Sequence, residues 1–171
     1  MKVCDWMAQW LADKGCTHAF GIVGGANLAM FEAISRRMTM VSVCHEQAAA
    51  IAAKYYYQTC RRIAPVLVTA GGGSANAITG VIEAHMDSIP LLVISGNELS
   101  RFINAPKTRT IGFQGFRPEH YIRESTKGCM TVDNALGLKY TLEKFYETAL
   151  EPRQGAVWVD VPQNIAAGEM E

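Results

Sequence analysis

The sequence lacks the features by which membrane, secreted and nucleic-acid-binding proteins are usually recognised. No apolar run approaches the roughly 20 residues that cross a bilayer. Sixteen basic residues balance sixteen acidic ones in a chain of 171 residues, so there is no excess of positive charge for nucleic acid or an anionic membrane. The first residues include an acid, Asp5, and no apolar core of a signal peptide. We therefore expect a cytoplasmic protein that binds neither membranes nor nucleic acids.

Cysteine and histidine show no spacing that is typical of a metal site or a disulfide framework. The five cysteines are an odd number without a Cys-x-x-Cys pair, and the four histidines are equally scattered. Reduced, buried thiols are the default for such a pattern, and we expect no metal ligands in this chain. Hydrophobic residues make up 49% of the sequence, which at this length is enough for one domain without cross-links.

Helix-like and strand-like segments alternate along the chain. The strand-like segments are continuous apolar runs, as expected for strands that are buried on both faces. This alternation predicts an α/β fold: an open, mostly parallel sheet of about six strands with helices on both faces. We expect the domain to span residues 1–163, with 164–171 as a frayed C-terminus or the start of an interdomain linker. The predicted strands are residues 18–23, 39–44, 65–69, 90–94, 129–132 and 156–161.

A long polar stretch, residues 96–116, separates the fourth predicted strand from the rest of the chain. It is irregular in pattern and long for a connection in a compact domain. Loops of this kind are usually functional or mobile.

Glu46 is the most informative single residue. It lies between the predicted strand 39–44 and a helix-like run that continues to about Cys60. A carboxylate at such a place is costly to bury, because loss of water penalises its charged form. The alanine-rich run that follows, residues 48–53, offers neither hydrogen bonds nor countercharge, so we expect Glu46 to hold a proton and pass it to a ligand nitrogen. The alternative is that Glu46 only caps the first helical turn, where negative charge is favoured.

Two glycine clusters follow other predicted strands. Gly24 and Gly25 come after the first, and Gly71 to Gly73 come after the third. In an open α/β sheet, ligands bind beyond the carboxyl ends of the strands. The two clusters and Glu46 are therefore expected at one edge of the sheet. The second cluster is not followed by Lys-Ser or Lys-Thr, so a nucleotide P-loop is not indicated.

Taken together, these residues resemble the N-terminal, pyrimidine-binding (PYR) domain of thiamine-diphosphate enzymes of the acetolactate synthase type. The resemblance covers nearly the whole chain, and it implies the thiamine-diphosphate-binding fold. The matching segments, in chain order, are Phe20-Gly21-Ile22-Val23-Gly24-Gly25-Ala26, His45-Glu46-Gln47, Val68-Thr69-Ala70-Gly71-Gly72-Gly73-Ser74-Ala75-Asn76, Met86-Asp87-Ser88-Ile89-Pro90, Gly112-Phe113-Gln114 and Trp158-Val159-Asp160-Val161-Pro162.

The resemblance implies a catalytic role for Glu46. In the family this acid hydrogen-bonds N1′ of the cofactor's aminopyrimidine ring and so promotes loss of the thiazolium C2 proton. By resemblance Gly25, Gly72 and Asn76 also lie on the cofactor-binding side. Gly25 is the glycine that approaches the reacting carbon, and its alternative is a plain tight turn.

Phe113 and Gln114 match residues that face the substrate from the long loop. An aromatic side chain packed against the body of the domain is the alternative for Phe113.

The resemblance also implies what this chain does not carry. In the family a second domain holds the diphosphate and Mg²⁺ through a Gly-Asp-Gly motif followed at a distance by Asn-Asn, and neither motif occurs here. We therefore expect a diphosphate-binding partner domain, in cis or as a separate subunit, and a homodimer or tetramer packed through the helices with residues 49–53 and 78–82. FAD is possible as an additional cofactor but is not indicated.

The implied function is the pyrimidine-binding half of a lyase or transferase that acts on 2-oxo acids such as pyruvate. Two other readings stay open. One is a non-catalytic assembly or regulatory module that keeps the fold, and the other is a flavodoxin-like nucleotide binder. Several residues depart from the family pattern and leave the particular reaction open: Ala48, Lys54, Tyr55, Gly72, Ala75 and Asn97.

Overall fold

A computed structural model describes residues 1–105 and 109–170, and it confirms the α/β fold. Residues 106–108, which belong to the predicted loop 96–116, and residue 171 lie outside the described part. The described helices are α1 (Val3–Asp13), α2 (Leu28–Ser35), α3 (Glu46–Cys60), α4 (Gly72–Met86), α5 (Ser100–Ile103), α6 (Glu119–Ile122), a 3-10 turn η1 (Arg123–Ser125), α7 (Ala135–Leu150) and α8 (Gln163–Ala166).

Six parallel strands form one open sheet in the order β2-β1-β3-β4-β6-β5. β4 and β6 pair over their full length, and every residue in both is buried. This explains their continuous apolar pattern, because helices cover both faces of the central strands. The strands are β1 (His18–Gly21), β2 (Thr39–Ser42), β3 (Val66–Val68), β4 (Leu91–Asn97), β5 (Gly128–Thr131) and β6 (Ala156–Pro162).

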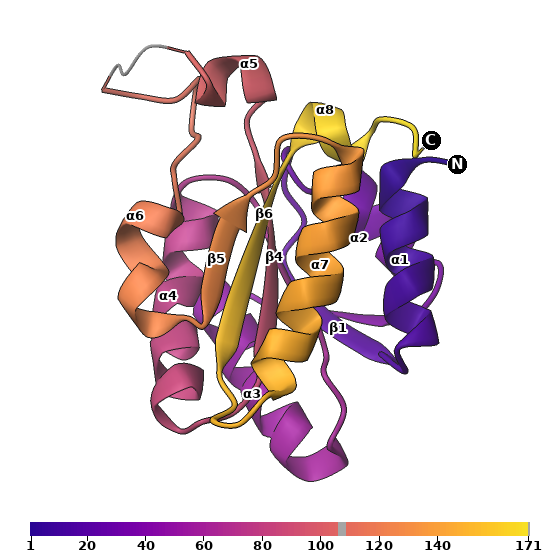
Figure 1. Cartoon of the computed structure of the whole chain (residues 1–171), viewed down its shortest axis with the longest axis vertical. Coiled ribbons are helices and arrows are strands. Elements are labelled where there is room, and N and C mark those ends of the chain that lie inside the picture. The colour runs from indigo at the N-terminus through magenta and orange to yellow at the C-terminus, as the bar shows by residue number, and fades with distance from the viewer. Residues whose placement is uncertain (106–108, 171) are drawn as a thin grey trace.

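Two apolar layers hold the helices against the sheet. Helices α1, α2, α7 and α8 pack on one face, whereas α3 and α4 pack on the other (Figure 1). Small residues let α3 and α4 approach each other closely: a Cβ added to Gly80 would lie 2.6 Å from Cβ of Ala50. Ala49, Ala50 and Ala53 are thus buried inside the domain, whereas Ile51 and Ala52 of the same helix are half-buried. The intermolecular contact expected through residues 49–53 and 78–82 stays a prediction.

Two segments differ from the pattern expected from the sequence. The fourth strand extends to Asn97 and is followed by the short helix α5, so the beginning of the stretch 96–116 is regular. Residues 163–166 form α8, and the backbone N–H of Met170 donates to the carbonyl of Met1 over 2.8 Å. Residues 163–166 therefore pack on the domain, because Ile165 and Ala166 contribute to the core. The predicted boundary at residue 163 stays a prediction.

The order of the strands creates a switch point between β1 and β3. From β1 the chain crosses to β2 on one side, and from β3 it crosses to β4 on the other. The turns that follow β1 and β3 therefore leave in opposite directions, and in open α/β sheets ligands bind at such a point, beyond the carboxyl ends of the strands. The glycine clusters at Gly24 and Gly71 lie in these two turns.

Candidate active site

Glu46 occupies the first position of α3, and the three residues 43–45 connect it to the end of β2 at Ser42. His45 is the N-cap: its backbone is extended, and its Nδ1 accepts a hydrogen bond from the backbone N–H of Gln47 over 3.2 Å. This local cap satisfies one free amide of the first turn. Because His45 caps the helix, the Glu46 carboxylate is not needed as the cap. Glu46 is only 7% exposed.

The contacts of the Glu46 carboxylate come from α4. The side-chain amide of Asn76 donates to Oε2 over 3.0 Å, and a Cβ added to Gly73 would lie 3.1 Å from Oε1. None of the described residues donates a hydrogen bond to Oε1. The expected alanine surroundings are thus wrong in part, because Ala49 and Ala50 face the core and Ala48 is exposed.

Thr69 joins the two glycine turns at the switch point. A Cβ added to Gly24 would lie 2.5 Å from Oγ1 of Thr69, and one added to Gly73 would lie 2.7 Å from its Cγ2. Ser74 fastens the same residue by donating from its hydroxyl to the carbonyl of Thr69 over 2.6 Å. Only glycine permits so close an approach of the two turns.

The Thr69 hydroxyl is an orphan. Its Oγ1 is buried and has no hydrogen-bond partner in the described part of the chain, which is unusual for a buried polar atom. The point that a Cβ at Gly73 would occupy lies close to both Thr69 and the Glu46 carboxylate. The site therefore combines the buried carboxylate of Glu46, the hydroxyl of Thr69 without a partner among the described residues, and glycine backbone that no side chain covers. This set suits a flat, nitrogen-containing ring with several hydrogen-bonding atoms.

Gly25 and Gly72 lie open at the same edge. An added Cβ would meet nothing within 4 Å at either residue, and neither has a positive φ. The chain itself therefore does not require glycine at these positions. Space beside their backbone is available to a bound molecule.

The long loop reaches the second glycine turn. Gly71 has a φ of +62°, and a Cβ added to it would lie 2.3 Å from the carbonyl oxygen of Gln114. Gln114 is therefore next to the turn that begins α4. Phe113 is 94% exposed, so the alternative of an aromatic ring packed against the domain is wrong for this chain.

Sequence reasoning missed two residues at this edge, Thr69 and Glu98. Thr69 lies within a matched segment, but a threonine at a strand end carries no signal that its hydroxyl lacks a partner. Glu98 is buried at the end of β4, where its Oε1 accepts hydrogen bonds from the backbone N–H groups of Phe113 and Gln114. Glu98 is distant in sequence from Gly112 and Gly115, which lie against its side chain in the folded chain. No local sequence pattern therefore indicates this contact.

A third buried acid, Asp160, lies beneath the loop, near the end of β6. Burial raises its pKa to about 7, against the opposing effect of hydrogen bonds from Ser95, Asn97 and Thr131. Asn97 Nδ2 donates to Oδ2 over 2.6 Å and Thr131 Oγ1 donates to the same oxygen over 2.9 Å. The network joins the ends of β4, β5 and β6 and thus forms the floor under the loop.

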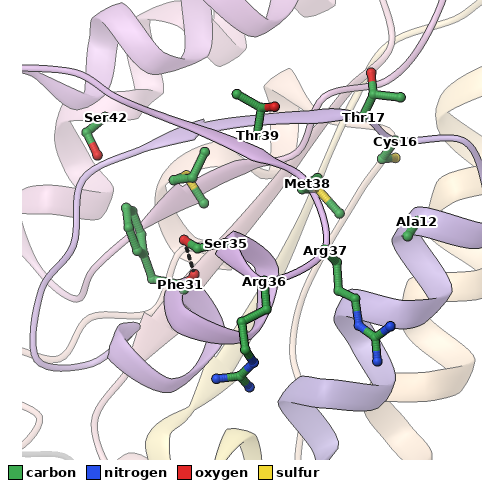
Figure 2. A pocket seen from close by; sticks show the side chains of 11 residues that line it. Ala12, Cys16, Thr17, Phe31, Ser35, Arg36, Arg37, Met38, Thr39 and Ser42 are labelled. Carbon is green, nitrogen blue, oxygen red and sulfur yellow. Dashed lines mark hydrogen bonds between the residues drawn. The ribbon is translucent and has the colours of Figure 1, made fainter.

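A broad hollow of about 930 Å³ lies elsewhere, beside the edge strand β2 (Figure 2). Arg36 and Arg37 border it, and Arg36 is held by Asp5 and Glu32 at 2.6 and 2.7 Å. The hollow contains none of the residues expected to bind a ligand. We place the candidate site at the switch point, because the buried acid and the orphaned hydroxyl lie there.

Residues 1–105 and 109–170 contain neither a helix suited to crossing a membrane nor a cluster suited to holding a metal ion. None of the helices in these ranges combines the length and the hydropathy needed to cross a membrane. No group of three or more His, Cys, Asp or Glu residues in these ranges is placed to hold a metal ion.

Comparison with known proteins places this geometry in a family. Residues 1–119 match the family described as "Thiamine pyrophosphate enzyme, N-terminal TPP binding domain". The large subunit of acetolactate synthase from Haemophilus influenzae is 34% identical over 162 residues, which are 94% of this chain and 27% of that protein. The isozyme 3 large subunit from Escherichia coli K12 is 35% identical over 166 residues, which are 94% of this chain and 28% of that protein.

The chain thus spans little more than a quarter of the length of these relatives. These relatives align with 94% of this chain. This similarity, the family match over residues 1–119 and the six-stranded parallel sheet are consistent with one another. The chain belongs to the family of N-terminal TPP-binding domains of thiamine pyrophosphate enzymes, and it is a pyrimidine-binding domain of the acetolactate synthase type.

Proposed function

We propose that this chain is the pyrimidine-binding half of a thiamine-diphosphate-dependent lyase or transferase that acts on 2-oxo acids such as pyruvate. The observation that carries the proposal is the Glu46 carboxylate, which is buried at the switch point. Asn76 donates to one of its oxygens, and no residue in the described ranges donates to the other. Support also comes from the similarity to acetolactate synthase large subunits.

Glu46 acts as the proton-controlling acid in this proposal. Its free oxygen hydrogen-bonds a nitrogen of the cofactor's aminopyrimidine ring, and burial strengthens that bond because water does not compete. Asn76 keeps the carboxylate oriented from α4. Thiamine diphosphate, when bound, supplies the carbon nucleophile and the electron sink for decarboxylation and carboligation.

The other residues shape the cofactor side and the substrate side. Gly25 and Gly72 offer open backbone that the cofactor can approach, and the Thr69 hydroxyl offers a hydrogen-bond partner to its ring. Phe113 and Gln114 face the substrate from the loop beside Gly71. Each of these groups binds or orients, whereas Glu46 moves a proton.

The remaining parts of the active site belong to partners in this proposal. A diphosphate-binding domain, in cis or as a separate subunit, holds the diphosphate and Mg²⁺. The chains assemble as a homodimer or tetramer in the cytoplasm. FAD is not indicated by any residue described above. Sedimentation of the complete protein checks the assembly, and a strictly monomeric active enzyme would contradict it.

Exchange of the C2 proton of bound thiamine diphosphate tests the role of Glu46. Glu46→Gln keeps the size of the side chain and its contact with Asn76 but removes the acid. In the complete protein we expect unchanged cofactor binding and loss of most C2–H exchange. Glu32→Gln is the matched control, because Glu32 is an exposed acid on α2, and it should exchange at the wild-type rate.

Unchanged exchange in Glu46→Gln would overturn the proposed role. Unchanged exchange together with unchanged assembly would instead favour the alternative, a non-catalytic module that keeps the fold. Circular dichroism of both variants checks that the fold is intact.

A further inference from the structure

The loop that carries Phe113 and Gln114 closes into a tight turn. The backbone N–H of Gly115 donates to the carbonyl of Ile111 over 2.9 Å, and these two residues form an antiparallel bridge. Gly112 has a φ of +58°, a conformation that glycine adopts without strain.

The carboxylate of Glu98 lies inside the turn. Its Oε1 accepts hydrogen bonds from the backbone N–H groups of Phe113 and Gln114 over 3.2 and 3.1 Å. Glu98 is only 8% exposed. Hydrogen bonds from two amides to one carboxylate are stronger than bonds between neutral groups, and a buried carboxylate needs such partners.

Glycines on both sides allow the turn to wrap around this carboxylate. A Cβ added to Gly112 would lie 2.8 Å from Cδ and Oε2 of Glu98, and one added to Gly115 would lie 2.8 Å from its Cγ. Side chains at these two positions would push the carboxylate out. The turn and Glu98 are therefore fitted to each other.

Glu98 is itself anchored to the floor of the sheet. Its backbone N–H donates to Oδ1 of Asn97 over 2.8 Å. Nδ2 of Asn97 donates to Oδ2 of Asp160 and, over 2.8 Å, to the carbonyl of Phe116. Because Asn97 and Asp160 are both fully buried, the end of β4 holds Glu98 and the last residue of the loop in one rigid frame.

The same loop contacts the cofactor side through Gly71. The carbonyl oxygen of Gln114 lies against Gly71, the residue before α4, and α4 carries Asn76. We propose that Glu98 is a positioning residue, whose carboxylate fixes Phe113 and Gln114 beside the Gly71 turn and so sets how the substrate is held. This inference rests on the proposed function, and it assigns Glu98 to substrate binding and not to activation of the cofactor.

Hydrogen–deuterium exchange of the complete protein tests the geometry without any reaction. In Glu98→Ala the amides of Phe113 and Gln114 lose their acceptor, and we expect peptides that cover residues 111–116 to exchange about tenfold faster or more. Glu98→Gln keeps a side-chain oxygen and should restore most of the protection. Glu119→Ala is the matched control, because Glu119 accepts a backbone hydrogen bond from Thr131 outside this loop over 2.5 Å.

Kinetics separate the substrate side from the cofactor side. We expect Glu98→Ala to raise KM for the 2-oxo acid about tenfold or more, since a misplaced loop weakens substrate contacts. C2–H exchange of bound cofactor should stay within about twofold of wild type, because Glu46 and Asn76 are untouched. Gly115→Ala supplies a second route to a displaced loop while the acid is retained, because its methyl group would lie 2.8 Å from Cγ of Glu98 and 2.7 Å from the carbonyl oxygen of Ile111.

The outcomes distinguish the positioning role of Glu98 from the proposed thiamine-diphosphate-dependent function. Unchanged loop exchange and unchanged KM in both variants would overturn the role of Glu98. Loss of C2–H exchange in parallel with the rise in KM would overturn its assignment to the substrate side alone. If the wild-type protein shows no C2–H exchange, the proposed function fails, whereas the amide measurement still confirms or rejects the contact between Glu98 and the loop.

Discussion

The side-chain amide of Asn76 donates a hydrogen bond to Oε2 of Glu46 over 3.0 Å. The bond crosses from the first helical turns of α4 to the first residue of α3, so it joins the elements that follow β3 and β2. It also occupies one carboxylate oxygen, whereas the other accepts no hydrogen bond from the part of the chain that the structure describes. The orientation of the acid thus depends on a residue that lies thirty positions away in the chain.

Asn76→Ala tests the importance of this orientation. A hydrogen bond to a carboxylate contributes about 1.5–3 kcal/mol to the free energy that holds the acid in place. Because Asn76 is exposed, we expect its contribution to be at the lower end of this range. We expect C2–H exchange of bound cofactor to fall about tenfold, with the fold intact. Gln58→Ala, an exposed amide near the end of α3, should leave exchange unchanged. A wild-type rate in Asn76→Ala would show that Glu46 is held by other means.

Asp160→Asn tests the buried acid beneath the loop. Burial raises the pKa of Asp160 to about 7 from an ordinary value of 3.8. Between these values the folded state binds a proton that the unfolded state does not, so this group makes the free energy of unfolding fall as pH rises from about 4 to 7. Above its folded pKa the contribution is constant. The slope can reach about 1.4 kcal/mol per pH unit.

Urea unfolding at several pH values measures this slope. Asp160→Asn should remove the contribution and flatten the profile between about pH 4 and 7 relative to wild type. The variant should also be less stable at its optimum by about 1–3 kcal/mol, because an amide nitrogen would face donors such as Asn97 and Thr131. Asp13→Asn, at an exposed acid on α1, should keep the wild-type slope, and an equal slope in both variants would contradict the prediction.

Lys54→Met tests an ion cluster between α3 and α4. Lys54 is only 1% exposed, and its Nζ lies 2.5 Å from Oε1 of Glu83 and 2.6 Å from Oδ2 of Asp87. Burial lowers the pKa of Lys54, but the hydrogen bonds to Asp87 and Glu83 outweigh it, and the pKa is raised overall. The stabilisation is therefore present below the ordinary lysine pKa and is lost only as pH rises through the raised value.

We expect Lys54→Met to lower the free energy of unfolding at neutral pH by about 1–3 kcal/mol. The two carboxylates would then repel each other, although their own exposure to water limits the penalty. Glu83→Gln leaves Asp87 as a partner and should cost less. Thermal unfolding compares the two variants, and an equal or greater loss in Glu83→Gln would contradict a shared cluster.

Local patterns were sufficient for most of the fold. The helix expected after Glu46 and as far as about Cys60 is found at Glu46–Cys60, with His45 as its N-cap. The strands β4 and β6 were recognisable because burial on both faces leaves no polar alternation. The helix α8 was missed, since a four-residue helix contains too few residues to show a period.

The sequence by itself determined the order of elements, the parallel sheet and the placement of Glu46 and the glycines at one edge, because these depend on periodicity within short segments. Only the tertiary structure decided which groups meet there: Asn76 on Glu46, Thr69 between two glycine turns, and Glu98 inside the loop. The physical reason is that such contacts join residues on different strands and helices. Their distances depend on how the helices pack against the sheet, which no local pattern encodes.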